Sequence, residues 1–306
     1  MIRWVLLAIV ALVCRTPFAQ SYDYRLAPLR IADNVYVFVG KTEDFSVGNG
    51  GNIVNTSFVL TSAGVVVIDA GPSLRYGEQM RAAIAKITAI PVTHILVTHA
   101  HPDHYLGAQA FSNVGIYAVP QTTIDIGQNG GAYLDNMFRL LLDWMKGSST
   151  VVPQVAVNTP TLVVGERTLR LIKLTGHTRG DLAVLDETSG TLFTGDLVFL
   201  DRTPTTPHAS ISEWLASLDR LQAVPHKTLV PGHGNPHGGA MGIMQTRNYL
   251  RWLDGYLREA AARGADMSEL LSTPAPERFA SLAVFRAEFA RTLAHLYPRY
   301  EKAVLK

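Results

Sequence analysis

The stretch Thr98-His99-Ala100-His101-Pro102-Asp103-His104 places three histidines and a carboxylate within six positions. It follows residues 92–97, a β-branched apolar run that predicts a buried strand. Side chains alternate along a strand, so the first two histidines leave the strand end on the same side. The proline then bends the chain, and we expect a short helix capped by the aspartate to turn the last two residues back over the same pocket. Neutral imidazoles beside carboxylates suit a pair of borderline divalent metals.

Three tight turns further along the chain supply the same residue types. Each follows a glycine at the end of a predicted strand, and the residues are His177, Asp196 and His233. Glycine lets the backbone turn sharply and approach closely without a Cβ clash. Strand ends from two sheets can converge on one rim, so all seven residues can share a site.

Counting ligands over these seven residues indicates a dinuclear site. Three nitrogens for one metal come from His99, His101 and His177. A second metal receives ligands from Asp103, His104 and His233. Asp196 is left to bridge both metals through its two carboxylate oxygens. Each metal then keeps room for a shared water, the open position that distinguishes a catalytic from a structural zinc site.

The organisation of the chain favours one large α/β unit, although two small domains remain an alternative. Its 306 residues are 47% hydrophobic, which allows an ample core. Strands and then a helix occur, and the order repeats, so we predict two sheets packed face to face with helices outside. This domain should span residues 20–238, with residues 239–306 as a helical extension packed on it. An apolar stripe from Leu134 to Met145 predicts a helix in the core that can also roof the pocket.

The N-terminus has the features of a signal peptide over residues 1–19. Arg3 precedes the apolar run Trp4–Val13, which is too short to span a bilayer. We therefore expect a periplasmic or secreted protein without a membrane anchor after cleavage; lipidation of Cys14, the only cysteine, is a minor alternative. Cleavage takes two arginines from 27 basic residues and nothing from 25 acidic ones, so the mature charge is near zero. A neutral chain disfavours a nucleic-acid partner, and we expect a small-molecule substrate.

Three residues near the ligand turns are candidates for substrate binding. Phe45 lies in the glycine- and asparagine-rich segment 41–52, which is either a lid over the site or a plain hairpin loop. Arg179 and Arg202 can bind a substrate carboxylate or phosphate, or can be solvated surface arginines.

Other polar residues have candidate supporting roles. Asp69 and Asp181 are candidates to fix the imidazoles from behind, with a turn or cap role as the alternative. His208 is predicted to be a loop residue, because seven ligands are already in hand.

The full pattern resembles the metallo-β-lactamase superfamily, whose members carry His-x-His-x-Asp-His followed by downstream His, Asp and His. The resemblance runs from about Val35 to His233 and implies the αβ/βα four-layer sandwich with the site at one edge. β-Lactamases of this fold usually have cysteine or serine where this chain has Asp196. Aspartate there looks like glyoxalase II and related esterases, lactonases and thioesterases. A persulfide-dioxygenase assignment would want a single iron, whereas the second-site ligands here are complete.

Three segments look like the quinoprotein relay system zinc metallohydrolases. They are Asp44 to Thr56, Asp69 to Gln79 and Asp201 to Pro207, together with the signal peptide. This resemblance implies an association with periplasmic dehydrogenases that use pyrroloquinoline quinone.

These observations predict an exported metallohydrolase with two Zn²⁺ per chain. It would cleave an ester, thioester, lactone or amide by a hydroxide that bridges the metals, with Asp103 as the catalytic residue that orients it. Two alternatives stay open: a β-lactam hydrolase, and a non-catalytic accessory protein of the quinoprotein dehydrogenase system that holds a small carboxylated cofactor.

Overall fold

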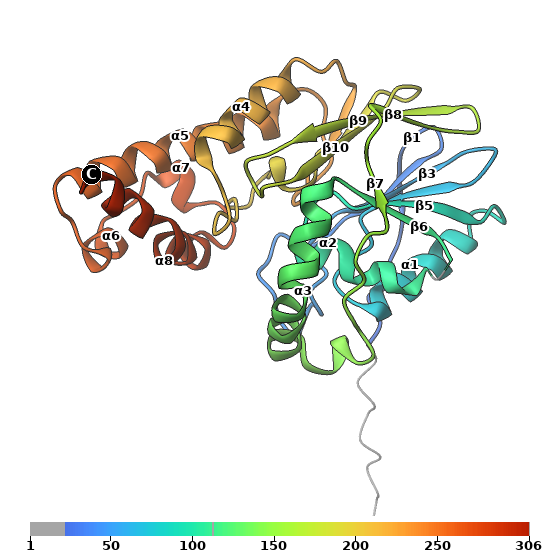
Figure 1. The fold of residues 1–306 in the computed structure, drawn as a ribbon, viewed down its shortest axis with the longest axis horizontal. Coiled ribbons are helices and arrows are strands. Elements are labelled where there is room, and N and C mark those ends of the chain that lie inside the picture. Colours follow the sequence, from blue (N-terminus) through green and yellow to red (C-terminus); the bar gives the residue numbers. More distant parts are fainter. Residues whose placement is uncertain (1–21, 112, 306) are drawn as a thin grey trace, which may run out of the picture.

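The computed structural model describes residues 22–111 and 113–305, which form two stacked β-sheets with helices on both outer faces (Figure 1). The signal peptide predicted for residues 1–19 lies outside the described residues.

The first sheet has seven strands in the order β1-β2-β3-β4-β5-β6-β7. Its strands are β1 (Leu29–Ala32), β2 (Val35–Phe38), β3 (Thr56–Leu60), β4 (Val65–Ile68), β5 (Val92–Leu96), β6 (Gly115–Ala118) and β7 (Val155–Ala156). The first four strands pair antiparallel, and β4 to β7 pair parallel. The carboxyl ends of β4 and β5 therefore meet at one edge, and the metal-ligand motif begins there.

The second sheet has five strands in the order β12-β11-β10-β9-β8. Its strands are β8 (Thr161–Val164), β9 (Arg167–Leu174), β10 (Asp181–Asp186), β11 (Thr191–Phe193) and β12 (Thr228–Val230). The pair β11 and β12 is parallel, so these two strands end at the same edge, and the other pairs are antiparallel.

Helices occur between and after the strands of both sheets along the chain. The α-helices are α1 (Leu74–Ala85), α2 (Pro102–Tyr105), α3 (Pro120–Leu141), α4 (Ile211–Gln222), α5 (Met241–Ala262), α6 (Met267–Ser272), α7 (Glu277–Ala280) and α8 (Phe285–Val304). Short 3-10 helices are η1 (Leu106–Ala110), η2 (Leu142–Met145) and η3 (Gly195–Leu197). Among the described residues, none of these helices is both long and apolar enough to cross a bilayer.

Three apolar clusters hold the layers together. The cluster between the sheets interleaves Val37 and Val66 of the first sheet with Leu182 and Val184 of the second. A second cluster packs α1, η1 and α3 on the outer face of the first sheet, and a third packs α4, α5 and α8 on the outer face of the second. Each fully buried aliphatic side chain contributes about 1.5–3 kcal/mol of transfer free energy. The predicted αβ/βα sandwich is confirmed.

The metal-ligand motif starts its helix differently from the prediction. Helix α2 begins at Pro102 with His101 as its N-cap residue, so Asp103 is not the cap but lies in the first turn. Proline suits the first helical position because its missing N–H has no partner there and its φ is already helical. Pro102 therefore begins the helix instead of delaying it.

The apolar stripe from Leu134 to Met145 does not form one continuous helical face. Helix α3 ends at Leu141, and Leu142 follows with a positive φ of 52°. Met137 is buried, whereas Phe138 and Leu140 are each 38% exposed. Some apolar side chains of this segment are therefore in the core, and others are at the surface.

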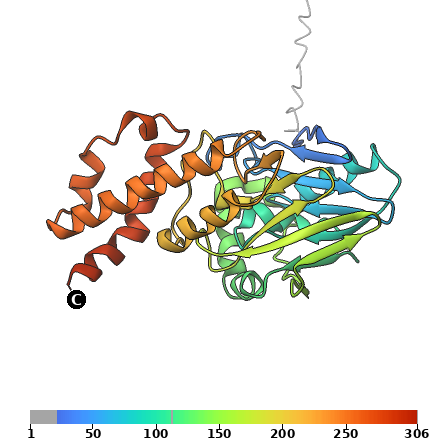
Figure 2. The same ribbon diagram turned by 90° about the horizontal axis from the view of Figure 1, so that it is seen from above.

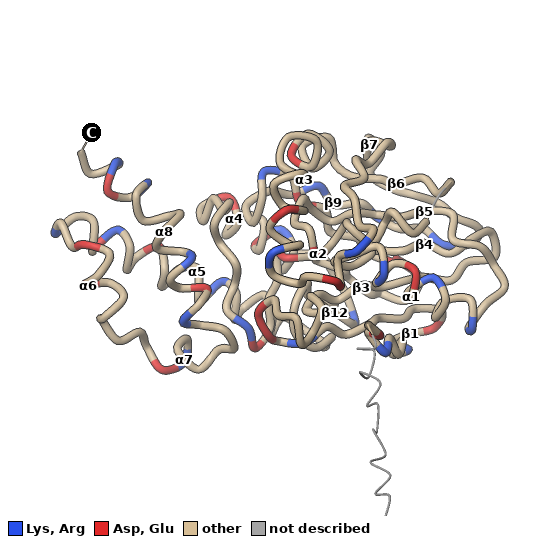
Figure 3. The backbone as a smooth tube through the Cα atoms, turned by 90° about the horizontal axis from the view of Figure 1, so that it is seen from below, with Lys and Arg blue, Asp and Glu red and all other residues tan. Residues whose placement is uncertain are grey.

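The C-terminal helices α5 to α8 extend from one end of the sandwich (Figure 2). Leu250 and Leu253 of α5 and Leu293 of α8 share a hydrophobic cluster with Trp214 of α4 and Leu229 of β12. Basic and acidic residues are interspersed along these helices and along the sandwich (Figure 3).

Candidate metal centre

All seven predicted metal ligands lie together at the edge of the sandwich where the strands end. The turn after β5 and the start of α2 carry His99, His101, Asp103 and His104. The second sheet contributes the other three, which follow β9, β11 and β12 and are His177, Asp196 and His233. Six of the side chains are buried, and His101 is 9% exposed.

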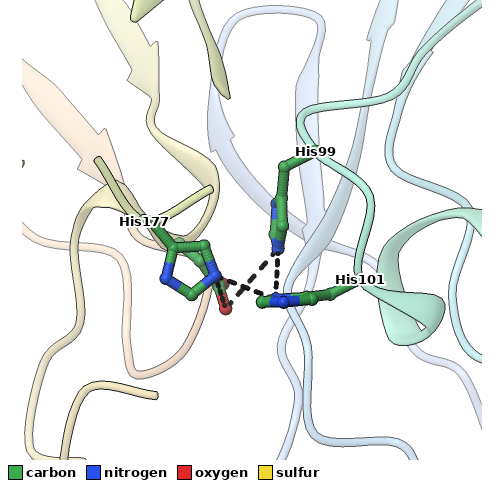
Figure 4. A group of neighbouring side chains, drawn as sticks. His99, His101 and His177 are labelled. Atoms are coloured by element: carbon green, nitrogen blue, oxygen red, sulfur yellow. Dashed lines mark hydrogen bonds and ion pairs between the residues drawn. The ribbon is translucent and has the colours of Figure 1, made fainter. Parts of the chain in front are cut away.

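Three imidazoles form the first group of candidate ligands (Figure 4). His101 Nδ1 lies 3.0 Å from His99 Nε2 and 2.9 Å from His177 Nε2. A tetrahedral zinc ion with bonds of about 2.0 Å sets its ligand atoms roughly 3.3 Å apart, so these nitrogens are close to the required spacing.

The second group contains two imidazoles and a carboxylate. Asp103 Oδ2 lies 3.8 Å from His104 Nε2 and 3.6 Å from His233 Nε2. Within each of the two groups, the candidate ligand atoms all lie within 4.8 Å of one another, as binding of a single ion requires.

Asp196 lies between the two groups and directs one oxygen at each. Its Oδ2 is 3.8 Å from His99 Nε2 and 3.4 Å from His177 Nε2. Its Oδ1 is 3.1 Å from His104 Nε2 and 3.3 Å from His233 Nε2. This is the geometry expected of a carboxylate that bridges two metals.

Two atoms in this centre test whether metal ions fit. Asp196 Oδ1 and His104 Nε2 are fully buried without a hydrogen-bond partner. Buried polar atoms are rarely left unsatisfied, because losing their water without a replacement costs free energy. A divalent ion beside each group would satisfy both atoms, so the donor set fits.

The electrostatic surroundings differ between the two groups. Burial lowers the pKa of His177 to about 3, and burial together with neighbouring imidazoles holds the pKa of His99 and His101 well below the usual value. These rings are therefore neutral and free to donate a lone pair. At His104 burial lowers the pKa, but the carboxylates of Asp196, Asp69 and Asp103 outweigh it and raise the pKa. These carboxylates therefore stabilise a positive charge at the second group, which the proton on His104 or a bound metal cation can supply.

Residues behind the ligands orient two of the imidazoles. Asp69 Oδ2 lies 2.7 Å from His104 Nδ1, and the same carboxylate accepts hydrogen bonds from the backbone N–H and hydroxyl of Thr98. His233 Nδ1 lies 2.7 Å from the carbonyl oxygen of Ile53. When these Nδ1–H groups donate, both Nε2 atoms are left free to face the centre. Asp69 therefore takes the position proposed for it.

Asp181 supports its ligand in a different way. Its carboxylate accepts hydrogen bonds from the backbone N–H groups of His177 and Thr178 rather than from the imidazole. It fixes the turn that carries the ligand.

Glycine is required in two of the ligand turns. A Cβ on Gly232 would lie 2.0 Å from Asp196 Oδ1, and one on Gly176 would lie 2.2 Å from the Cα of Trp214. Gly176 also has a φ of +128°, which side chains rarely adopt. The close approach that the sequence predicts is present at both positions.

His208 is a neighbour of the centre that the sequence prediction missed. Its Nδ1 lies 2.9 Å from Nε2 of His101, the ring nitrogen that does not face the first group. His208 follows a proline in an irregular loop, and 107 positions separate it from His101, so no local pattern marked it.

The three predicted substrate contacts have different surroundings. Phe45 and Arg202 line the cavity that opens over the centre. Arg202 is buried and its guanidinium donates to Glu288 of α8 and to Thr205, so it is already paired. Arg179 pairs with Asp125 and lines an adjoining cleft instead.

Comparison with known proteins assigns the family. Residues 49–233 match the model of the metallo-beta-lactamase superfamily. Acyl-coenzyme A thioesterase MBLAC2 of Homo sapiens is 27% identical over 235 residues, covering 65% of this chain and 80% of that protein. Metallo-beta-lactamase IND-1 of Chryseobacterium indologenes is 24% identical over 234 residues, covering 73% and 89% of the two chains. A metallo-beta-lactamase from Pontibacter korlensis superimposes with a TM-score of 0.60 at 24% identity, covering 74% of this chain and 99% of that one. The matched region contains every candidate ligand, and the chain therefore belongs to the metallo-beta-lactamase superfamily.

Proposed function

We propose that the protein is an exported dinuclear zinc hydrolase that cleaves an ester, thioester, lactone or amide. The observation that carries the proposal is Asp196, whose two oxygens face two separate three-ligand groups beside an open cavity. Superfamily membership with thioesterase relatives supports a metal-dependent hydrolase.

Zinc ions held by these two groups would polarise the scissile carbonyl and make hydroxide available near neutral pH. Asp103 lines the cavity, so its carboxylate can accept a hydrogen bond from the attacking water and orient it. His101 and His233 also line this cavity, which brings both groups within reach of one substrate.

A turnover screen tests the hydrolase proposal. Purified protein would be assayed on esters, thioesters, lactones, β-lactams and phosphodiesters, with zinc measured by elemental analysis. We expect about two zinc ions per chain and turnover that a chelator abolishes and added Zn²⁺ restores. A protein that holds its metals and binds small carboxylates but turns over no compound would instead be the accessory protein of a quinoprotein dehydrogenase system.

β-Lactam hydrolysis is the alternative enzymatic activity. It is included in the screen because a metallo-beta-lactamase is among the similar proteins. We expect penicillins and carbapenems to be poor substrates beside simple esters or lactones. The reason is Asp196, which replaces the cysteine or serine that the resemblance associates with β-lactamases. A β-lactam as the best substrate would contradict this reasoning.

Export has its own test. Mass spectrometry of protein from an envelope fraction should find a new N-terminus near Gln20, because Arg3 and the apolar run after it suit a cleaved signal peptide. Full-length protein in the cytosol would contradict export.

A further inference from the structure

We propose that the substrate has two unlike ends, an apolar arm that lies along α3 and an anionic group that binds Arg291 of α8. This inference rests on the proposed function and names the substrate class for the same site.

The walls of the cavity over the metal centre differ in chemistry. One wall is apolar and is made by Met137 and Leu140 of helix α3. The other is charged and is made by Arg202, Glu288 and Arg291. Because Asp103 and Asp196 of the candidate metal centre line the same cavity, a substrate cleaved there can contact both kinds of side chain.

The apolar wall leaves part of its side-chain surface exposed to solvent. Leu140 lines the cavity yet is 38% exposed, and Met137, one turn earlier on α3, lines it from a buried position. An acyl chain lying on this wall would bury apolar surface on both partners. Burial of a methylene changes an affinity by up to about 4-fold, so activity should rise with chain length.

The charged wall has an arginine with donors to spare. Arg202 and Arg291 both pair with the single carboxylate of Glu288, at 3.2 and 2.7 Å. Arg202 is buried and each of its three guanidinium nitrogens donates a hydrogen bond within the protein, whereas the side chain of Arg291 is 36% exposed. The second partner of Arg291 is Asp44, which contacts it at 3.1 Å and does not line the cavity. A guanidinium has five N–H donors, so two carboxylate contacts leave Arg291 able to bind a third anion.

This anion site would be specific to the C-terminal extension. Arg291 lies on α8, beyond the region 49–233 that matches the family model. Helix α8 would therefore add a substrate-recognition wall to a metal centre that the superfamily region supplies.

The charge preference can be measured with a matched pair of thioesters. Hexanoyl thioesters of 3-mercaptopropionate and of 3-mercaptopropionamide have nearly the same shape and differ by one negative charge. We expect the wild type to favour the carboxylate in kcat/KM by about 10-fold or more, as for a hydrogen bond to a charged group. Arg291→Met should remove this preference, Arg291→Lys should recover part of it, and Arg286→Met, an exposed arginine on the same helix, should keep it.

A binding measurement separates recognition from turnover. The S-hexyl thioether of 3-mercaptopropionate cannot be hydrolysed, and its affinity for metal-stripped protein can be measured by calorimetry. We expect Arg291→Met to weaken this binding and Arg286→Met to leave it unchanged.

The apolar arm has its own matched pair. Activity should rise from acetyl to hexanoyl to decanoyl thioesters in the wild type. Leu140→Ser should flatten this dependence, whereas Phe138→Ser should preserve it, because Phe138 has the same exposure on α3 but is not in the cavity wall.

The outcomes distinguish the inference from the function on which it rests. Chelator-sensitive turnover without a charge preference, or an Arg291→Met protein that loses both thioesters equally, overturns the inference and leaves the hydrolase standing. Thioether binding that depends on Arg291, with no turnover of any substrate, overturns the hydrolase and supports the anion site.

Discussion

Asp196 is the residue that lies between the two candidate metal positions. Each of its oxygens lies 3.1–3.8 Å from nitrogen atoms of one group, and its negative charge would offset part of the repulsion between two dications. Burial raises the pKa of Asp196, but the imidazoles of His233 and His104 outweigh this and hold it well below the usual value, so the carboxylate is ionised.

Replacing Asp196 by alanine should weaken both metal positions at once. His104→Ala should empty mainly the second position, because His104 faces only Oδ1 of Asp196. Elemental analysis should find about two zinc ions in the wild type, about one in His104→Ala, and one or fewer with little activity in Asp196→Ala. Two tightly held ions in Asp196→Ala would rule out the bridge.

His208 should strengthen metal binding at the first group. If His101 uses Nδ1 for the metal, its Nε2–H can donate to His208 Nδ1, which holds the ring in place. His208→Ala should lower the zinc affinity of this group by about 10-fold, measured by competition with a chromophoric chelator. His295→Ala, an exposed histidine on α8, is the control, and equal affinities in the two variants would contradict the role.

At the scale of elements, helix α8 is joined to the site by a buried ion pair. Glu288 of α8 contacts Arg202 in the loop after η3, and both side chains are at most 2% exposed. Arg291 of the same helix reaches Asp44 in the segment 41–52. These contacts hold three distant parts of the chain against one cavity.

Breaking this pair should cost far more stability than breaking a pair at the surface. Glu288→Ala leaves Arg202 buried without its partner, so we expect a loss of about 3–5 kcal/mol in the free energy of unfolding by urea. Arg263→Ala removes a pair with Glu269 in which both side chains are 47% exposed, and should cost much less stability because solvent screens such a pair. The double variant Arg202→Met/Glu288→Leu should recover much of the loss, and equal costs for the two single variants would contradict this account.

For the whole molecule, the C-terminal helices complete the core of the second layer. Trp214 and Leu218 of α4 pack in the same cluster as Leu250 of α5 and Leu296 of α8. Without α5 to α8 this apolar face would be open to water, at about 1.5–3 kcal/mol for each large side chain.

A chain that ends at residue 238 should therefore fail to give a stable, soluble monomer. Size-exclusion chromatography and near-ultraviolet circular dichroism should show aggregation and loss of fixed tertiary packing. A chain that ends at residue 304, the end of α8, should behave as the full protein does. A well-folded 1–238 fragment would show that the helices form an independent unit.

The amino-acid sequence by itself determined the fold and the seven residues that come together at the candidate metal centre. The histidine and aspartate motif combines strand period and ligand chemistry within a few residues, and three glycine turns carry the remaining ligands. Such signals are local, because a strand end and a tight turn aim a side chain through the conformation of its immediate neighbours. Asp69 was also found this way, since it directly follows a buried strand.

Only the tertiary structure decided which atoms meet. It placed His208 behind His101 and joined Arg202 to Glu288, contacts that span 107 and 86 positions. It also brought α8 into the cavity wall, whereas the sequence of that helix predicts only packing against the domain. A charged residue on an amphipathic helix has the same local pattern whether it faces solvent or a ligand cavity. The packing of distant segments resolves that ambiguity, because it alone determines which face of the helix is covered and by what.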